Sequence, residues 1–172
     1  MSGKSIALDD EQLVCLEECL LIHYKFHPGS GAFVVVADHW EKQEAGCRAF
    51  IRIRFSGVEA FEREPGIHRA SWEFVEQYRL RAFAPPKVFQ LVKTVPLGEG
   101  RTRVELWFGP AFGGVSFTCR EYSAWLRVTR ARQQGSEWEY RDATTGDLVD
   151  FFDPFGEWTK TSGAASFRNL IH

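Results

Sequence analysis

The chain has 172 residues and a mass of 19.7 kDa, which fits a single domain that can bury a core without disulfide support. Hydrophobic residues at 44% and charged residues at 26% are ordinary for a globular protein, and no apolar run reaches the length of a bilayer span, so we expect a cytoplasmic protein without membrane contact. The four cysteines form no C-x-x-C pair, which favours reduced, packed thiols.

Charge is distributed unevenly along the chain. Residues 1–47 hold 3 basic and 8 acidic side chains, residues 48–132 hold 15 and 8, and residues 133–172 hold 3 and 7, so the net charges are −5, +7 and −4. The total of −2 argues against a nucleic-acid partner, because a domain that binds nucleic acid is expected to be basic.

The first predicted element begins near Leu20. Apolar and polar residues alternate over residues 14–26, but a helix capped by Asp9 or Asp10 competes at the start, so residues 10–20 stay open between helix and strand.

A turn at residues 27–31 leads from this strand into residues 32–37, a run too apolar to have one face in water. The two segments predict a hairpin near the centre of the core. If the hairpin pairs His27 with Ala32, His39 lies opposite Leu20.

Residues 47–55 alternate arginines with apolar side chains at a period of two, which predicts a strand with one wet and one dry side. The same rhythm and the turn residues between the segments predict further strands at 72–83, 88–95, 101–108, 115–119, 124–132, 138–141 and 148–152. About ten strands joined by short loops indicate an all-β, mainly antiparallel domain with little helix, either a β-sandwich or a flattened barrel. We expect this single domain to span residues 1–158, followed by a tail at 159–172 that is flexible or docked.

No catalytic or metal-binding motif stands out, and no cofactor is predicted. His23 and His27 are four residues apart, which on a strand separates them by roughly 13 Å and prevents them from sharing a metal ion. A hydrolase that uses His39 or His68 with an Asp or Glu base is a third-ranked reading, because these residues do not form a spacing that brings an acid and a base together.

The arginine-rich strands are the surface feature with the strongest contrast. If these strands are neighbours, their polar sides form a basic face interleaved with aromatic rings, which suits an acidic protein partner. The competing explanation is that nearby glutamates such as Glu73 and Glu105 neutralise the arginines within the sheet. The predicted partner contacts are Arg52, Arg54, Arg103, Trp107 and Trp125.

The short phrase Phe-x-Gly-Val-x-x-Phe at residues 55–61 follows an acidic pair, a long strand and a glycine-turn hairpin. Over residues 9–63 this pattern resembles small β-rich bacterial proteins of mostly unknown role, some of which are immunity partners of toxins. The resemblance transfers no catalytic residue. It implies a cognate toxin as one candidate partner.

These observations favour a non-enzymatic protein-binding module of immunity or regulatory type, which occludes a partner through a sheet face or edge. The alternative is a small-molecule carrier, a β-barrel whose cavity is lined by aromatic residues such as Phe33, Trp40 and Trp72. Pairing of exposed strand edges would also allow a homodimer.

Overall fold

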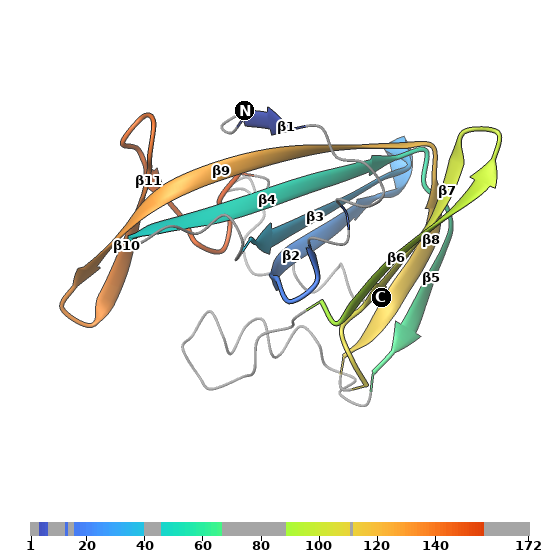
Figure 1. Ribbon diagram of the computed structural model, residues 1–172, viewed down its shortest axis with the longest axis horizontal. Coiled ribbons are helices and arrows are strands. Elements are labelled where there is room, and N and C mark those ends of the chain that lie inside the picture. Colours follow the sequence, from blue (N-terminus) through green and yellow to red (C-terminus); the bar gives the residue numbers. More distant parts are fainter. Residues whose placement is uncertain are drawn as a thin grey trace.

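The computed structural model describes residues 4–6, 13, 16–39, 46–66, 89–110 and 112–156. The strand predicted at 72–83 and the tail predicted at 159–172 lie outside these ranges. Within them the prediction of an all-β fold is confirmed, since eleven strands form two antiparallel sheets (Figure 1). No helix in the described ranges has the length and apolar character needed to cross a bilayer.

The larger sheet is built around the long strand β9, which pairs with β4 along one edge and with β10 and β1 along the other. The strand order is β11-β10-β9-β4-β3-β2, with β1 beside β9. Its strands are β1 (Lys4–Ile6), β2 (Leu20–His27), β3 (Ala32–Asp38), β4 (Cys47–Ser56), β9 (Glu121–Gln134), β10 (Glu137–Asp142) and β11 (Leu148–Val149).

The smaller sheet has four strands in the order β5-β8-β7-β6. They are β5 (Glu59–Pro65), β6 (Leu91–Gly98), β7 (Arg101–Trp107) and β8 (Gly113–Cys119). The β6–β7 hairpin is tighter than the predicted loop over 96–100, because β6 continues to Gly98. The backbone reverses through Glu99 and Gly100, which both have positive φ.

The two sheets share a corner at which the chain passes directly from one to the other. Figure 1 shows β4 leading into β5 and β8 leading into β9, with the smaller sheet running steeply across the end of the larger one. The Arg120 amide donates to the Ser56 carbonyl at 3.0 Å, and Gly57 turns with a φ of 62°. Such bent connections are how strands change sheets in orthogonal packing.

The main core lies between the sheets and is rich in phenylalanine. Phe117 of β8 packs against Phe33 of β3, Phe55 of β4 and Phe61 of β5, with ring centroids 5.0 to 5.9 Å apart. The odd-numbered residues of β3 and β4 supply this core, as the period-two pattern predicts.

A second, smaller core covers the opposite face of the larger sheet. Val34, Val36 and Phe50 lie there, and Phe151 and Phe155, from the segment after β11, pack against them. Burial on both faces explains why the run at 32–37 carries no polar side chain.

The β2–β3 hairpin pairs His27 with Ala32, as expected, but only β3 is buried along its whole length, because β2 stands last in the described strand order. At its other end Leu20 lies opposite Asp38, not His39, because a bulge between Leu21 and His23 shifts the register by one residue. The strand starts at Leu20, as predicted.

Candidate interaction surface

Three of the five predicted contact residues lie together on the larger sheet, on the face turned away from the smaller sheet. Arg52 of β4 is directly opposite Trp125 of β9, and Arg54 is opposite Ser123. The guanidinium carbon of Arg52 lies 4.6 Å from the centroid of a Trp125 ring, which is a cation–π contact. The alternation in β4 therefore places Arg52, Arg54 and Trp125 in one cluster.

Arg52 and Arg54 differ in exposure although they share a strand and a face. Arg52 is only 5% exposed and its guanidinium contacts the Trp125 ring, so it offers little surface to a partner. Arg54 and Trp125 are partly exposed, and Arg54 makes no ion pair in the described part of the chain. Arg54 and Trp125 are thus the two side chains of this cluster that can reach another molecule.

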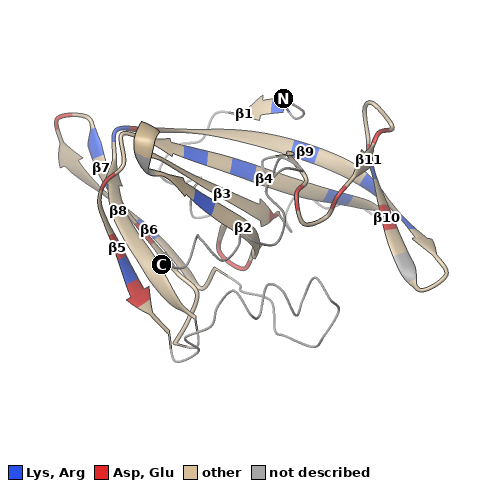
Figure 2. Cartoon of the chain, turned by 180° about the vertical axis from the view of Figure 1, so that it is seen from behind, with Lys and Arg blue, Asp and Glu red and all other residues tan. Residues whose placement is uncertain are grey.

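Lys25 extends the positive charge across the sheet. It pairs with Val34 in the β2–β3 register, and Val34 in turn pairs with Arg54, so the two cations flank one valine on the same face. Figure 2 shows basic positions on β2, β4 and β9. We call Lys25, Arg52, Arg54 and Trp125 the basic face.

The other two predicted contacts, Arg103 and Trp107, lie on the outer face of the smaller sheet. Nε of Arg103 is 3.1 Å from a Glu105 oxygen, and the other oxygen of Glu105 is 3.9 Å from Lys93. Here the competing explanation holds, because the arginine is neutralised within its own sheet. The five predicted residues therefore form two separate groups.

Trp107 packs over a glycine of the neighbouring strand. A Cβ at Gly114 would lie 2.8 Å from the Trp107 ring, so the missing side chain makes room for the indole. Leu91, which is 46% exposed, pairs with Trp107 from the other side. This part of the outer face is apolar.

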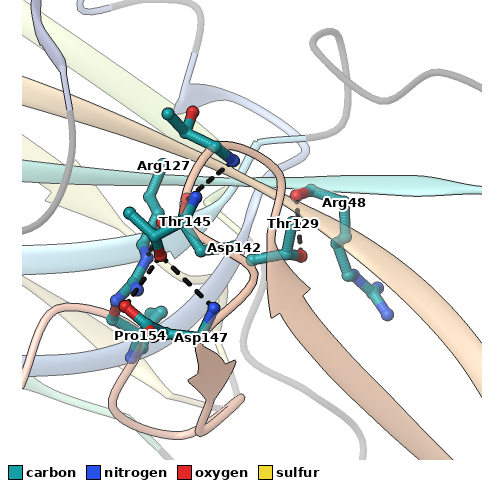
Figure 3. Close-up of polar contacts among 8 residues, drawn as sticks. Arg48, Arg127, Thr129, Asp142, Thr145, Asp147 and Pro154 are labelled. Carbon is teal, nitrogen blue, oxygen red and sulfur yellow. Dashed lines mark hydrogen bonds and ion pairs between the residues drawn. The ribbon is translucent and has the colours of Figure 1, made fainter.

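Arg127 of β9 has a structural role that its place in the sequence did not reveal. Its Nε donates to Asp142 at 2.7 Å, and its Nη1 donates to the carbonyl of Pro154 at 2.5 Å (Figure 3). Burial alone would raise the pKa of Asp142. The hydrogen bonds from the amides of Thr145 and Thr144 and the charge of Arg127 together outweigh burial and hold this pKa below its usual value.

Arg48 of β4 contacts the segment after β11 as well, the same segment whose Pro154 carbonyl accepts from Arg127. Its Nη2 lies 2.6 Å from the buried Asp38 carboxylate, and its guanidinium lies over the Phe151 ring at 5.1 Å. Burial alone would lower the pKa of Arg48, but the hydrogen bonds and charges of Asp38 and Tyr140 raise it above its ordinary value. Arg48 is therefore charged at every physiological pH.

The residues of the carrier and hydrolase readings are only partly described. Phe33 is 1% exposed among the core rings, while Trp40 and Trp72 lie outside the described residues. His39 is buried, and His68 is outside the described ranges. Among the described residues no group of three or more His, Cys, Asp or Glu side chains is placed to hold a metal ion. The small-molecule carrier and the hydrolase therefore both remain predictions.

The fold and its surface thus define a two-sheet, all-β protein with a basic face on one side. Comparison of the chain with models of protein families, with curated proteins and with solved structures found no match.

Proposed function

We propose that this protein is a non-enzymatic binding module that occludes an acidic surface of a partner protein through its basic face. The observation that carries the proposal is the arrangement of Arg54 beside Trp125, with the guanidinium of the buried Arg52 in contact with the Trp125 ring. Tryptophan and arginine dominate the energetics of protein interfaces, above all where their geometry is fixed before binding. An immunity-type factor that blocks a cognate toxin fits this arrangement.

The two edge strands of the smaller sheet are poorly suited to pairing with a strand of another protein, which favours binding through a sheet face. At β6, the Glu17 carboxylate accepts a hydrogen bond from the Val92 amide at 3.1 Å, and Pro96 supplies no amide hydrogen. The other edge strand, β5, is rich in exposed charged side chains, which also discourage pairing.

The electrostatic part of the proposal concerns association rate. Arg54 makes no ion pair with the described residues, and the positions directly opposite it on the neighbouring strands are Val34 and Ser123, which carry no charge. A local positive field of this kind speeds encounter with a negatively charged partner, and salt weakens it.

The test uses the purified chain and the purified product of its neighbouring gene. We expect Trp125→Ala to weaken the affinity about 30-fold or more, because it removes the anchoring ring. We expect Arg54→Ala to lower the association rate and to reduce its dependence on salt. Both quantities are measured by biolayer interferometry at several sodium chloride concentrations.

Matched controls come from the outer face of the smaller sheet. Arg103→Ala and Trp107→Ala change the same two residue types and are expected to leave affinity unchanged, because they lie on the other outer face. If the pattern is reversed, with the loss at Arg103 and Trp107, the binding surface is the smaller sheet. Failure of the chain to bind any neighbouring gene product would remove the immunity-type reading.

A further inference from the structure

The β9–β10 hairpin carries a second cluster of arginines, on the sheet face opposite to Trp125. Arg130 of β9 is directly across from Arg141 of β10, and Arg132 is across from Glu139. Arg130 and Arg132 lie an even number of residues from Leu126 in β9, so they are on the same face of the sheet as Leu126, which packs against the main core. Figure 1 shows, however, that the hairpin extends far beyond the smaller sheet, so no strand of that sheet covers this end.

A groove of about 530 Å³ lies against this cluster. Its wall is completed by the turn that follows β10, including Thr144, Thr145 and Gly146. A volume of this size falls within the range of small-ligand sites in proteins. The groove therefore has room for a charged group and for part of the molecule that carries it.

The charges around the groove are unbalanced. Nε of Arg141 lies 2.7 Å from the Glu139 carboxylate, and its Nη1 donates to the Gly146 carbonyl at 3.2 Å. Arg130 and Arg132 are exposed and make no ion pair with any part of the described chain. Three guanidinium groups thus face one carboxylate.

Asp142 also borders the groove, but its carboxylate is already engaged. One oxygen accepts from the amides of Thr144 and Thr145, and the other accepts from Arg127. Asp142 is consequently not available to neutralise Arg130 or Arg132. The groove keeps an excess of about two positive charges.

This arrangement has a cost in the empty protein. Like charges directly across from one another on antiparallel strands are destabilising, and Arg130 and Arg141 form such a pair. A bound anion would convert the repulsion into attraction, and the guanidinium forks match the oxygens of phosphate groups. A cation would be repelled.

From this geometry we infer that the groove between Arg130, Arg132 and Arg141 binds a phosphomonoester group. Such a group carries a charge of about −1.5 to −2 at neutral pH and has three acceptor oxygens, which matches the charge excess and the number of guanidinium groups. Free phosphorylated small molecules and phosphorylated protein side chains present the same chemistry. The inference is independent of the proposed partner, because it concerns the other face of the sheet.

The test is calorimetric titration of the full chain alone, at low ionic strength, with four probes: inorganic phosphate, adenosine monophosphate, a phosphothreonine peptide and succinate. We expect saturable 1:1 binding of the phosphate probes, weakened by added sodium chloride. The tighter of the nucleotide and the phosphopeptide identifies the source of the phosphate. Succinate, a dicarboxylate, should bind more weakly than either.

Three variants decide where the probes bind. The double variant Arg130→Ala with Arg132→Ala is expected to lose about 10-fold or more in affinity, and Arg130→Lys alone is expected to lose part of it. Arg101→Ala, at the exposed tip of the β6–β7 hairpin, is the matched control and should bind like the unaltered chain. The double variant removes both the repulsion between Arg130 and Arg141 and the cross-strand attraction between Arg132 and Glu139, so its melting temperature should stay close to that of the unaltered chain.

Absence of saturable binding for every phosphate probe would overturn the inference. Equal binding by the double variant would overturn it as well, because the phosphate would then lie elsewhere. Succinate binding as tight as the phosphate esters would replace the phosphomonoester with a carboxylate.

Discussion

Gly113→Ala is expected to lower the free energy of unfolding by at least about 3 kcal/mol, one of the two largest effects of a single substitution that we predict. Gly113 begins β8 and has a φ of 72°, a conformation that a residue with a side chain adopts at a cost of about 1 kcal/mol. The larger part of the effect comes from the surroundings of Gly113.

A methyl group at Gly113 would collide with backbone atoms, which cannot swing aside as the end of a side chain can. The added Cβ would overlap the Glu64 carbonyl oxygen and would lie 2.6 Å from the Gly66 amide nitrogen. Gly113 is also fixed on its own side, since its amide donates to the Gly109 carbonyl at 2.8 Å and its carbonyl accepts from the Phe108 amide at 2.8 Å. Relief of the collision therefore requires β5 and β8 to separate.

Gly135→Ala is the matched control, because Gly135 has a φ of 63° but nothing lies within 4 Å of an added Cβ. We expect a loss of about 1 kcal/mol there. Equilibrium unfolding in urea, with the slope compared between variants, measures both values. If the two variants lose equal stability, the close approach of β5 to β8 is not as tight as the structure indicates.

The alternation of residues 47–55 was sufficient to predict the strand, its two faces and the burial of Ile51 and Ile53. It was not sufficient to predict which arginines would be exposed. Arg48, Arg52 and Arg54 have the same parity, yet Arg48 is held by Asp38 and lies over Phe151, Arg52 is buried against Trp125, and Arg54 is partly exposed. Exposure depends on segments about a hundred residues away, which a local pattern does not contain.

The grouping of the candidate contacts needed the strand order. Trp125 and Trp107 have similar local surroundings in the sequence, each within a strand that carries arginines, but they lie on different sheets. The pairing of β4 with β9 joins segments about 70 residues apart and decides that Trp125 lies beside Arg52. Periodicity gives the face of a strand, and only tertiary pairing gives its neighbour.

The arginine-rich groove was missed for a related reason. In the sequence Arg130 and Arg132 look like the wet side of one more strand, and Arg141 belongs to the next. A tight turn at Gly135 joins two strands of even alternation, and this was the available signal that Arg130 and Arg141 face one another. Two arginines opposite one another are unfavourable, so a pairing rule based on stability alone would have avoided that register.

The second large effect is expected for Asp142→Asn, which should cost about 3 kcal/mol at pH 7. Asparagine can still accept the hydrogen bonds from the Thr144 and Thr145 amides, so the loss isolates the pair with Arg127. The Asp142 side chain is 7% exposed and the Arg127 side chain is 11% exposed. Removal of the carboxylate therefore leaves a largely buried guanidinium whose remaining described contact is the Pro154 carbonyl. A charge left in such a place is far more costly than a missing surface pair.

The same pair gives a dependence of stability on pH with a definite sign. Because the pKa of Asp142 is lower in the folded protein than in the unfolded chain, its contribution is fully present above the unfolded value of about 4 and is lost as the pH falls through the folded value. The difference in unfolding free energy between the unaltered chain and Asp142→Asn should therefore be constant between pH 6 and pH 7, on the order of its full size, and should shrink below about pH 4.

A double-mutant cycle separates the pair from its surroundings. Arg127→Met and Asp142→Asn together should cost clearly less than the sum of the two single changes, with a coupling of about 2 kcal/mol, because the double variant leaves no unpaired charge. Arg101 and Glu99, an exposed pair at 3.2 Å, are the matched control and should couple by less than about 0.5 kcal/mol. Equal coupling in both cycles would mean that water reaches Arg127 as freely as Arg101, and that the contact of Arg127 with the Pro154 carbonyl does not shield the ion pair from solvent.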